Sequence, residues 1–391
     1  MSQGEVDERQ PIDVVAVDVG GTKIAAALVR VGGGGSKPSV RFVHRVPTQA
    51  HLGSAAVMRG IMGVIQSVMD DVASVVAGAD ADAGAVAAAK AGNAESSTAA
   101  TTPVTPEIRG IGISSAGVIG TDGSVVSATD LIRGWAGTPL AARVKERFDM
   151  PVVALNDVHA HALGEVLWGA GATVSTSAGV RVGAGAHAAE SAPQGGAMLL
   201  AAVGTGIGGA VCVEGRVLRG AHGLGGHVGH VIAPAAAGRR CSCGRFGHVE
   251  SVASGSGIIA EYVRVCAASG RSVAAGIDGG EIARKATAGE REAAVVIRTA
   301  GMSLGRALGS LANVVDPDSV VLSGSVTKAG DLWWRSLREG FAESAMDVAA
   351  TIPLVHGELG DEAPLIGAAE AFVRTSGVCG VPKGIWVEDA R

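Results

Sequence analysis

The sequence predicts a duplicated α/β fold in which two lobes enclose a central cleft. Two segments of the same design carry this prediction. Residues 13–31 and residues 198–218 each read as an apolar strand, a glycine-rich turn and a second apolar strand. A length of 391 residues is also more than one small core accommodates. We therefore expect two related halves, each built around such a hairpin.

The other elements are expected to alternate between helices and strands. Apolar periodicity predicts helices over residues 53–77, 290–314 and 364–374, and strands that run into glycine turns over 107–119 and 319–326. Residues 79–106 and 174–196 are rich in small and polar residues and poor in large apolar ones. We expect both segments to be poorly ordered insertions.

Composition excludes several classes of function. A net charge of −5 and an aromatic content of 3% argue against a nucleic-acid partner. The opening residues MSQGEVDERQ lack the pattern of a signal peptide, and no uninterrupted apolar run approaches the roughly 20 residues of a membrane helix. We expect a cytoplasmic protein without a membrane partner, whose ligand is a small molecule. An odd number of cysteines, 5, fits reduced thiols or metal ligation better than disulfides.

The turns of the two hairpins are candidate phosphate sites. Glycine lets backbone N–H groups approach an anion, and hydroxyl and ammonium groups add further donors. One such turn would be weak evidence, because many ordinary hairpins close in this way, but two equivalent turns are stronger. The candidate residues are Gly20, Gly21, Thr22 and Lys23 in the first turn and Gly204, Thr205, Gly206, Gly208 and Gly209 in the second. Asp18, just before the first turn, either caps it or holds Mg²⁺.

Residues 151–166 predict a strand that delivers Asn156 and Asp157 to the start of a helix. Either residue could merely cap that helix. In the functional interpretation, Asp157 is a general base that takes the proton of an attacking hydroxyl, and Asn156 binds the same substrate. His159 and His161 are expected on the helix surface.

A glycine-rich segment at residues 226–250 gathers potential metal ligands. Cys241, Cys243, His248 and His230 supply the four ligands of a closed tetrahedral Zn²⁺ site, which would be structural because no position is open to water. The spacing is unlike that of the common C-x₂-C fingers. Glu250 could cap a helix or accept a hydrogen bond from a sugar hydroxyl, and the spacing does not decide between these roles.

Taken together, these motifs resemble the ROK family of sugar kinases and repressors. The resemblance rests on DVGGTK, LND, VGTGIGG, GHVGH, CSCGRFGHVE and the later SGS turn, in family order, and covers nearly the whole chain apart from the two insertions. It implies an actin-like, hexokinase-type fold that closes on a sugar, with ATP and Mg²⁺ in the cleft. On this basis residues 1–155 and a last helix at 364–391 form the N-terminal lobe, and residues 156–363 form the C-terminal lobe with the zinc loop.

The resemblance also implies roles for individual residues. Asp157 corresponds to the catalytic base, and the sugar contacts correspond to Gly117, Asn156, His230 and Glu250. The two glycine turns correspond to the phosphate sites, and Gly324 to a position near the adenosine. Zinc in this family is structural and fixes the loop that carries the sugar-contacting histidine. Many members form homodimers or homotetramers.

Two departures from the family pattern bear on the metal and on the sugar. His248 stands where members usually have a third cysteine, and imidazole still closes the zinc tetrahedron. His227 stands where most sugar kinases of the family have a glutamate that binds sugar hydroxyls. The segment HGLGGHVGH is most similar to bacterial N-acetylmannosamine kinases, which implies ATP-dependent phosphorylation of the 6-hydroxyl of N-acetylmannosamine in sialic acid breakdown.

Other functions remain open at this point. The nearest alternatives are a glucokinase and an N-acetylglucosamine kinase. A sugar-responsive repressor of the same family is less expected, because such repressors carry a helix-turn-helix ahead of the first strand and only about ten polar residues precede it in this sequence.

Overall fold

The structure is a computed structural model that describes residues 11–32, 36–90, 106–129, 131–173, 196–376 and 385–386. Most of the second expected insertion, residues 174–196, lies outside these ranges.

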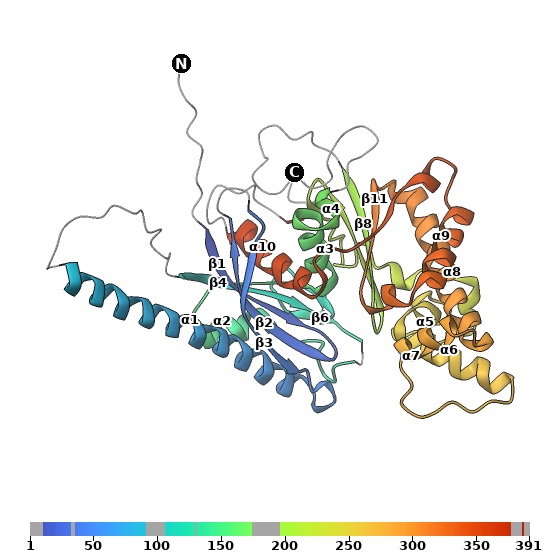
Figure 1. Ribbon diagram of the computed structural model, residues 1–391, viewed down its shortest axis with the longest axis horizontal. Coiled ribbons are helices and arrows are strands. Elements are labelled where there is room, and N and C mark those ends of the chain that lie inside the picture. The colour runs from blue at the N-terminus through green and yellow to red at the C-terminus, as the bar shows by residue number, and fades with distance from the viewer. Residues whose placement is uncertain are drawn as a thin grey trace, which may run out of the picture.

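Two sheets form the frame of the described chain, and both have the same strand order (Figure 1). The first sheet runs β3-β2-β1-β4-β7, with β1 (Ile12–Val19), β2 (Lys23–Val31), β3 (Ser39–Pro47), β4 (Ile108–Ser115) and β7 (Val152–Asn156). The second runs β10-β9-β8-β11-β12, with β8 (Ala197–Val203), β9 (Ile207–Val213), β10 (Arg216–Val217), β11 (Ser319–Ser323) and β12 (Leu354–His356). A small hairpin of β5 (Val118–Ile119) and β6 (Val125–Ser127) stands apart.

The strand directions repeat as well. Along the strand order of each sheet, the first two pairings are antiparallel and the last two are parallel. The two predicted hairpins are equivalent, since Val19 pairs with Ile24 across the first turn and Val203 pairs with Ile207 across the second. The prediction of a duplicated α/β fold is therefore confirmed. Strand β1 is buried on both faces, which explains its continuous apolar sequence.

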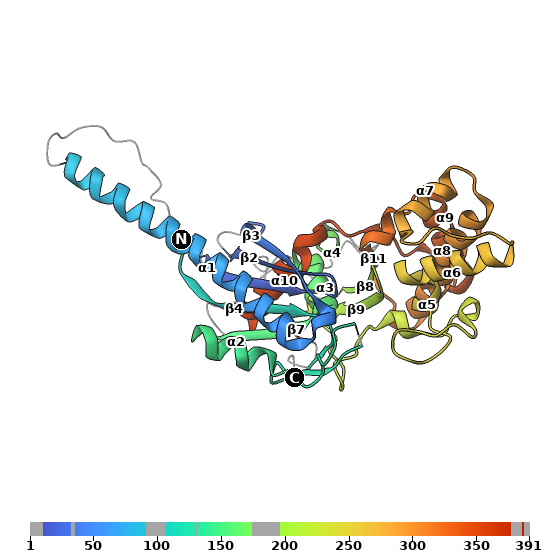
Figure 2. The same cartoon turned by 90° about the horizontal axis from the view of Figure 1, so that it is seen from below.

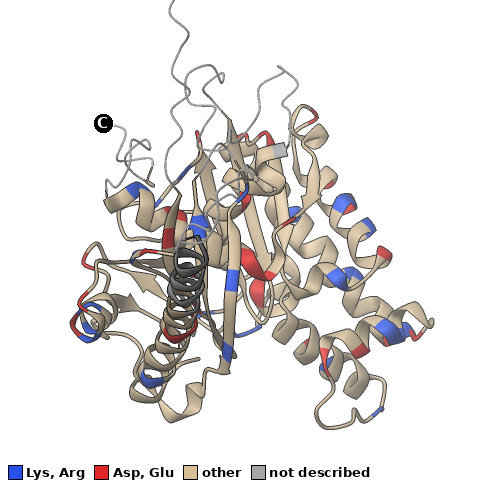
Figure 3. Ribbon diagram, turned by 60° about the vertical axis from the view of Figure 1, so that its left-hand side comes forward, with Lys and Arg blue, Asp and Glu red and all other residues tan. Residues whose placement is uncertain are grey.

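Helices fill the connections between the strands. Their bounds are α1 (Ser54–Lys90), α2 (Leu140–Phe148), α3 (Asp157–Trp168), α4 (Ala170–Thr173), α5 (Glu250–Ala253), α6 (Gly255–Ala268), α7 (Gly279–Thr287), α8 (Arg291–Val315), α9 (Asp331–Ser344) and α10 (Ala363–Ser376). Short 3₁₀ turns include η2 (Val228–His230), η4 (Ser325–Lys328) and η6 (Gly360–Glu362). Segments with basic and with acidic residues occur on the helices of both lobes (Figure 3).

Helix α1 is longer than expected. It continues to Lys90, so the first part of the expected insertion at 79–106 is helical. The alanine-rich sequence accounts for this extension, because alanine has high helix propensity even without large apolar residues. The expectation that 79–106 is poorly ordered stays a prediction, and residues 91–105 lie outside the described ranges. The stretch Ser54–Ala77 is long and apolar enough to cross a membrane by length and composition alone. In this structure it packs Ile61 and Ile65 into the core beside the first sheet.

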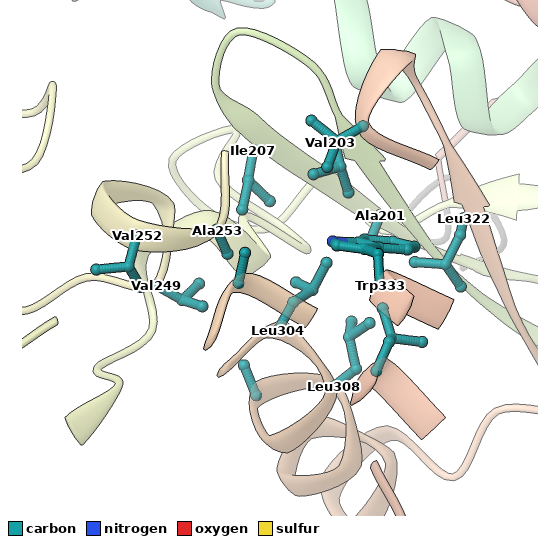
Figure 4. Packing of buried hydrophobic residues seen from close by; sticks show 14 of the residues in the cluster. Ala201, Val203, Ile207, Val249, Val252, Ala253, Leu304, Leu308, Leu322 and Trp333 are labelled. Carbon is teal, nitrogen blue, oxygen red and sulfur yellow. The ribbon is translucent and has the colours of Figure 1, made fainter. Parts of the chain in front are cut away.

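The second sheet is covered by a helical layer. Trp333 of α9 is fully buried and packs with Leu304 of α8, and Leu322 of β11 belongs to the same cluster (Figure 4). This core reaches Val249 and Val252 beside the segment of the predicted zinc site. The segment with the metal ligands is therefore supported by the main core of this lobe.

Helices α3 and α10 lie between the two sheets (Figures 1 and 2). They pack against each other closely: a Cβ atom at Gly367 would lie 1.7 Å from Ala160 O, and one at Gly164 would lie 2.4 Å from Ala363 O. Helix α10 contacts strands of the first sheet, whereas α3 contacts strands of both. We propose a lobe boundary near Asn156, with α10 returning to complete the N-terminal lobe.

Candidate active site

A cleft of about 1070 Å³ is lined by residues from both halves of the chain. We call it the central cleft. It brings together fourteen of the predicted site residues: Asp18, Gly21, Gly117, Asn156, Asp157, Gly204, Thr205, Gly206, Gly208, His227, His230, Cys243, Glu250 and Gly324. The other predicted residues, Gly20, Thr22, Lys23, Gly209, Cys241 and His248, are not part of its lining.

Asp157 begins α3 at the point where β7 ends. Asn156 caps this helix, because its Oδ1 accepts hydrogen bonds from the backbone N–H groups of Val158 and His159. Its Nδ2 donates to Gly117 O and to Asp157 Oδ1, both at 2.9 Å. The capping role left open for Asn156 is therefore present, and the same side chain holds the Asp157 carboxylate in place.

The Asp157 carboxylate has an unusual protonation equilibrium. Burial raises its pKa, and hydrogen bonds from Val158 N and Asn156 oppose the shift. Asn156 Nδ2 and Val158 N both donate their hydrogen bonds to the Oδ1 atom of this carboxylate. A carboxylate with a raised pKa at the edge of a cleft is suited to accept a proton from a bound hydroxyl.

Asp18 lies at the end of β1 in the same cleft. Ser114 Oγ donates a 2.8 Å hydrogen bond to its Oδ1. Burial raises the pKa of Asp18 to about 7, and the Asp157 carboxylate adds to this. Two half-buried carboxylates that repel each other provide the oxygen ligands that Mg²⁺ prefers, so the donor set fits a divalent cation.

The two glycine turns flank these carboxylates. Gly324 follows β11 with φ of +93°, and a Cβ atom there would lie 2.5 Å from Val203 O, so only glycine allows this turn to approach the second hairpin. Lys23, at the start of β2, forms a 2.6 Å ion pair with Asp361 of η6. Asp361 lines the cleft, so this pair brings the Lys23 ammonium group to its rim.

Two histidines of the 226–250 segment also line the cleft. His227 and His230 have stacked rings with centroids 6.2 Å apart. Burial lowers the pKa of His227, and His230 lowers it further, which favours a neutral imidazole. The Nδ1 atom of His227 is buried without a hydrogen-bond partner in the described structure.

The four predicted zinc ligands converge. Ligand atoms of His230, Cys241, Cys243 and His248 all lie within 4.8 Å of one another. Two sulfur and two nitrogen donors at this spacing are what a tetrahedral zinc site requires. Because His230 belongs both to this group and to the cleft lining, a bound metal would fix one wall of the cleft.

Glu250 connects the candidate metal site to the second hairpin. Its Oε2 accepts a 2.9 Å hydrogen bond from Ile207 N, and its Oε1 accepts bonds from Ser242 Oγ and Cys241 Sγ. Glu250 also begins α5. Of the two roles considered for it from the sequence, the helix cap is not seen, because Val249 is the N-cap of α5 and no described side chain caps that helix. Glu250 does line the cleft, where the role of a sugar-hydroxyl acceptor stays a prediction.

Comparison with known proteins identifies the family. Residues 98–190 and 187–375 match the model of the ROK family. The chain belongs to the ROK family. It is 27% identical to a glucokinase of Halalkalibacterium halodurans over 90% of this chain and 92% of the relative. It is also 27% identical to an N-acetylmannosamine kinase of a strain of Escherichia coli over 80% of this chain and 82% of the relative.

The fold of a ROK protein matches as well. The crystal structure of the ROK hexokinase from Thermus thermophilus superposes with a TM-score of 0.64 at 27% identity, over 92% of this chain and 97% of that one. The expected actin-like, hexokinase-type fold is thereby confirmed.

Two histidines lie elsewhere than expected. His159 and His161 were expected on the surface of α3, but His159 is 1% exposed and His161 lines the central cleft of this ROK chain. The ring of His159 lies 3.0 Å from Gly225 O and edge-on to Trp386. The expectation is wrong because α3 is enclosed between two sheets and has almost no solvent-facing side.

Sequence reasoning also missed a second cavity beside the glycine turns of this ROK chain. Its volume is about 660 Å³, and Thr205 is one of the residues that line it. Ile258, Ile259 and Ala283 supply apolar walls, and Ser325 follows Gly324 at its edge. No local motif marks these residues, since they come from α6, α7 and η4 and meet only in the folded chain. Asp361 was missed for the same reason.

Proposed function

We propose that this protein is an ATP-dependent sugar kinase that transfers the γ-phosphoryl group to the 6-hydroxyl of a hexose or N-acetylhexosamine. The observation that carries the proposal is the raised pKa and fixed position of the Asp157 carboxylate in a cleft shared with both glycine turns. Membership of a family with kinases among its named relatives supports it.

In this mechanism Asp157 accepts the proton of the 6-hydroxyl as that oxygen attacks phosphorus. Asn156 orients the carboxylate, and it is itself fixed by the helix N-terminus and by Gly117 O. The raised pKa brings the base nearer to neutral pH, where proton transfer from an alcohol is more favourable.

The phosphate chain of ATP would lie against the two hairpin turns. Backbone N–H groups of Gly21, Gly204 and Gly206 and the hydroxyl of Thr205 are the donors that these turns offer, and Lys23 adds a positive charge. Asp18 would hold Mg²⁺ directly or through water, and Mg²⁺ in such sites neutralises charge on the phosphoryl oxygens. The apolar cavity beyond Thr205 and Gly324 has the position and size to accept the adenosine.

For the metal group we propose a structural zinc. The four donors are all protein side chains, so the coordination shell would be closed and the ion would take no part in the chemistry. Its effect would be to fix the loop that carries His230 beside the sugar.

We further propose N-acetylmannosamine as the preferred acceptor. The observation that favours it is the neutral His227, whose buried Nδ1 has no hydrogen-bond partner in the described structure. A neutral imidazole offers one donor and one acceptor, whereas the carboxylate usual at this position in sugar kinases offers acceptors only. One donor together with one acceptor suits an N-acetyl group at C2, whereas a carboxylate suits a hydroxyl group that donates.

Glucose is the second candidate acceptor. The glucokinase of Halalkalibacterium halodurans is as similar in sequence as the N-acetylmannosamine kinase and aligns over a larger share of both chains. A panel of hexoses and N-acetylhexosamines assayed by ADP release decides between them. We expect the highest kcat/KM for N-acetylmannosamine, and a higher value for glucose would reject this choice of sugar while keeping the kinase.

The base assignment has its own test. Asp157→Asn removes the proton acceptor but keeps the shape, so we expect turnover to fall by at least about 10²-fold while the sugar still binds in calorimetry. Asp149→Asn is the matched control, because Asp149 is an exposed residue in the left-handed region, which asparagine tolerates. Near-normal kcat in Asp157→Asn would show that the base lies elsewhere.

A further inference from the structure

His161 is a histidine that the proposed mechanism does not use. It follows Asp157 by four residues on α3, and side chains at this spacing share one face of a helix. Both side chains line the central cleft. The His161 side chain is 14% exposed, and its Nε2 atom is buried without a hydrogen-bond partner in the described structure.

Glu165, the nearest carboxylate, does not satisfy this nitrogen. Its Oε1 lies 4.0 Å from His161 Nε2, which is too far for a hydrogen bond. Both Glu165 oxygens are already used, since they accept bonds from the backbone N–H groups of Ala170, Glu358 and Leu359. A buried polar atom without a partner destabilises the free protein, so a partner supplied by a ligand would remove that penalty.

The surroundings of His161 belong to the phosphate side of the cleft. Asp361 acts electrostatically on His161 and also on Asp18, and it holds Lys23 in an ion pair. By contrast, the charges that act on His227 are those of His230 and Glu250, on the sugar side. His161 is therefore grouped with the carboxylates and the lysine beside the first glycine turn.

The protonation state of His161 also matters. Burial lowers its pKa, while the Glu165 and Asp361 carboxylates raise it. Burial is the larger effect, so the imidazole is neutral near pH 7 and can carry its single proton on either ring nitrogen. With the proton on Nε2, the ring has one hydrogen bond to donate to an acceptor that reaches it.

We propose that His161 Nε2 donates a hydrogen bond to the phosphoryl group that this enzyme transfers, first in ATP and then in the 6-phosphate product. The inference rests on the proposed kinase function. Asp157 would act on the attacking hydroxyl, and His161, one turn further along the same helix, would hold the group that the hydroxyl attacks.

Binding measurements on two variants test the inference. His161→Ala removes the donor, and His161→Gln retains an N–H group near the position of Nε2. Each variant is titrated by calorimetry with glucose, glucose 6-phosphate, N-acetylmannosamine and N-acetylmannosamine 6-phosphate. Because hydrogen bonds to charged groups are stronger than neutral ones, we expect His161→Ala to bind the 6-phosphate about ten- to hundred-fold more weakly. Sugar affinity should change by less than about two-fold, since the sugar lacks that group.

The expected rescue separates a contact from a structural role. His161→Gln should recover most of the affinity for the 6-phosphate, whereas a residue that only fills space would gain nothing from the amide. His44→Gln, a histidine on β3 outside the cleft lining, is the matched control and should leave all four affinities unchanged. Thermal unfolding of each variant verifies that it is folded.

The outcomes are distinct. Equal losses for sugar and 6-phosphate, or no loss for either, would overturn the inference while leaving the kinase function intact. A wild-type protein that phosphorylates no sugar in the panel would overturn the proposed function, and the inference with it.

Discussion

At the start of α3, Asp157 must be ionised to accept a proton, yet burial favours its protonated form. Its pKa lies above the ordinary 3.8, so the ionised fraction falls as pH decreases through a higher value than for a free aspartate. We therefore expect kcat/KM to decline on the acid side at a pH clearly above 4. The measurement is a pH–rate profile at saturating Mg²⁺, with circular dichroism at each pH as a check of folding. An acid limb at about pH 4 or below would contradict the raised pKa.

The four converging ligands predict a measurable metal content. Elemental analysis of the purified protein should give about one zinc per chain, which is the stoichiometry of a closed four-ligand site. His248→Ala should lower this content and the melting temperature, because three ligands hold zinc less tightly. His222→Ala, at an exposed histidine outside the group, should retain the metal. Wild-type protein with well under one zinc per chain would refute the site.

Individual residues differ in how far the sequence predicts them. Asn156 and Asp157 follow from a strand that ends at a helix start, which is a local pattern. The candidate zinc ligands follow from the chemistry of cysteine and histidine. His161 was misplaced, although its spacing of four residues from Asp157 puts both side chains on one face of α3. The sequence alone does not show that this face meets a cleft and not solvent, because the second sheet that encloses it is distant in sequence.

At the scale of elements, the crossing of α3 and α10 depends on the absence of side chains. A Cβ atom at Gly367 would lie 1.7 Å from Ala160 O, so the helices must separate to accept one. We expect Gly367→Ala to destabilise the protein by about 1–3 kcal/mol, the usual range for overpacking. Denaturant unfolding measures the change.

The control for this variant is Gly63→Ala on α1. Gly63 is exposed, and a Cβ atom there would meet nothing within 4 Å, so alanine should be neutral or stabilising through its helix propensity. Equal stability of the two alanine variants would show that the crossing is not tight in solution.

Elements with a strong period were the easiest to predict. The hairpins around Gly20 and Gly204 were recognised because apolar runs on either side of a glycine turn leave few other conformations. The end of α1 was misjudged because alanine favours a helix without producing an amphipathic pattern. The 3₁₀ turn η4 has no periodic sequence pattern and was not predicted. Its first neighbour, Gly324, packs closely on the Val203 backbone, which is a contact that the sequence does not indicate.

At the scale of the whole molecule, ligands that bridge both lobes should stabilise the folded chain as a unit. Either N-acetylmannosamine or a non-hydrolysable ATP analogue, at 100 times its Kd, should raise the free energy of unfolding by about 2.7 kcal/mol. Differential scanning fluorimetry records the change as a higher melting temperature. Asp157→Asn should retain the shift with sugar, since the role proposed for the carboxylate is in the chemical step. Absence of any shift with both ligands would argue against a cleft that binds them.

The duplication and the cleft were predictable from two repeated motifs, but the exact partners across the cleft were not. Lys23 and Asp361 are 338 residues apart in sequence, and no local signal connects them. The same applies to the apolar cavity, whose walls come from α6, α7 and η4. Long-range pairing of this kind depends on the three-dimensional packing of both halves.

The groups proposed to bind phosphate and those proposed to bind the sugar come from separate parts of the chain. The glycine turns connect strands of the two sheets, and Asp18 lies near the end of β1. His227 and His230 stand beside a 3₁₀ turn in an irregular segment, and His230 is one of the four candidate metal ligands. Under the proposed roles, mutations in that segment would alter which acceptor is chosen and would leave the residues proposed for phosphoryl transfer in place.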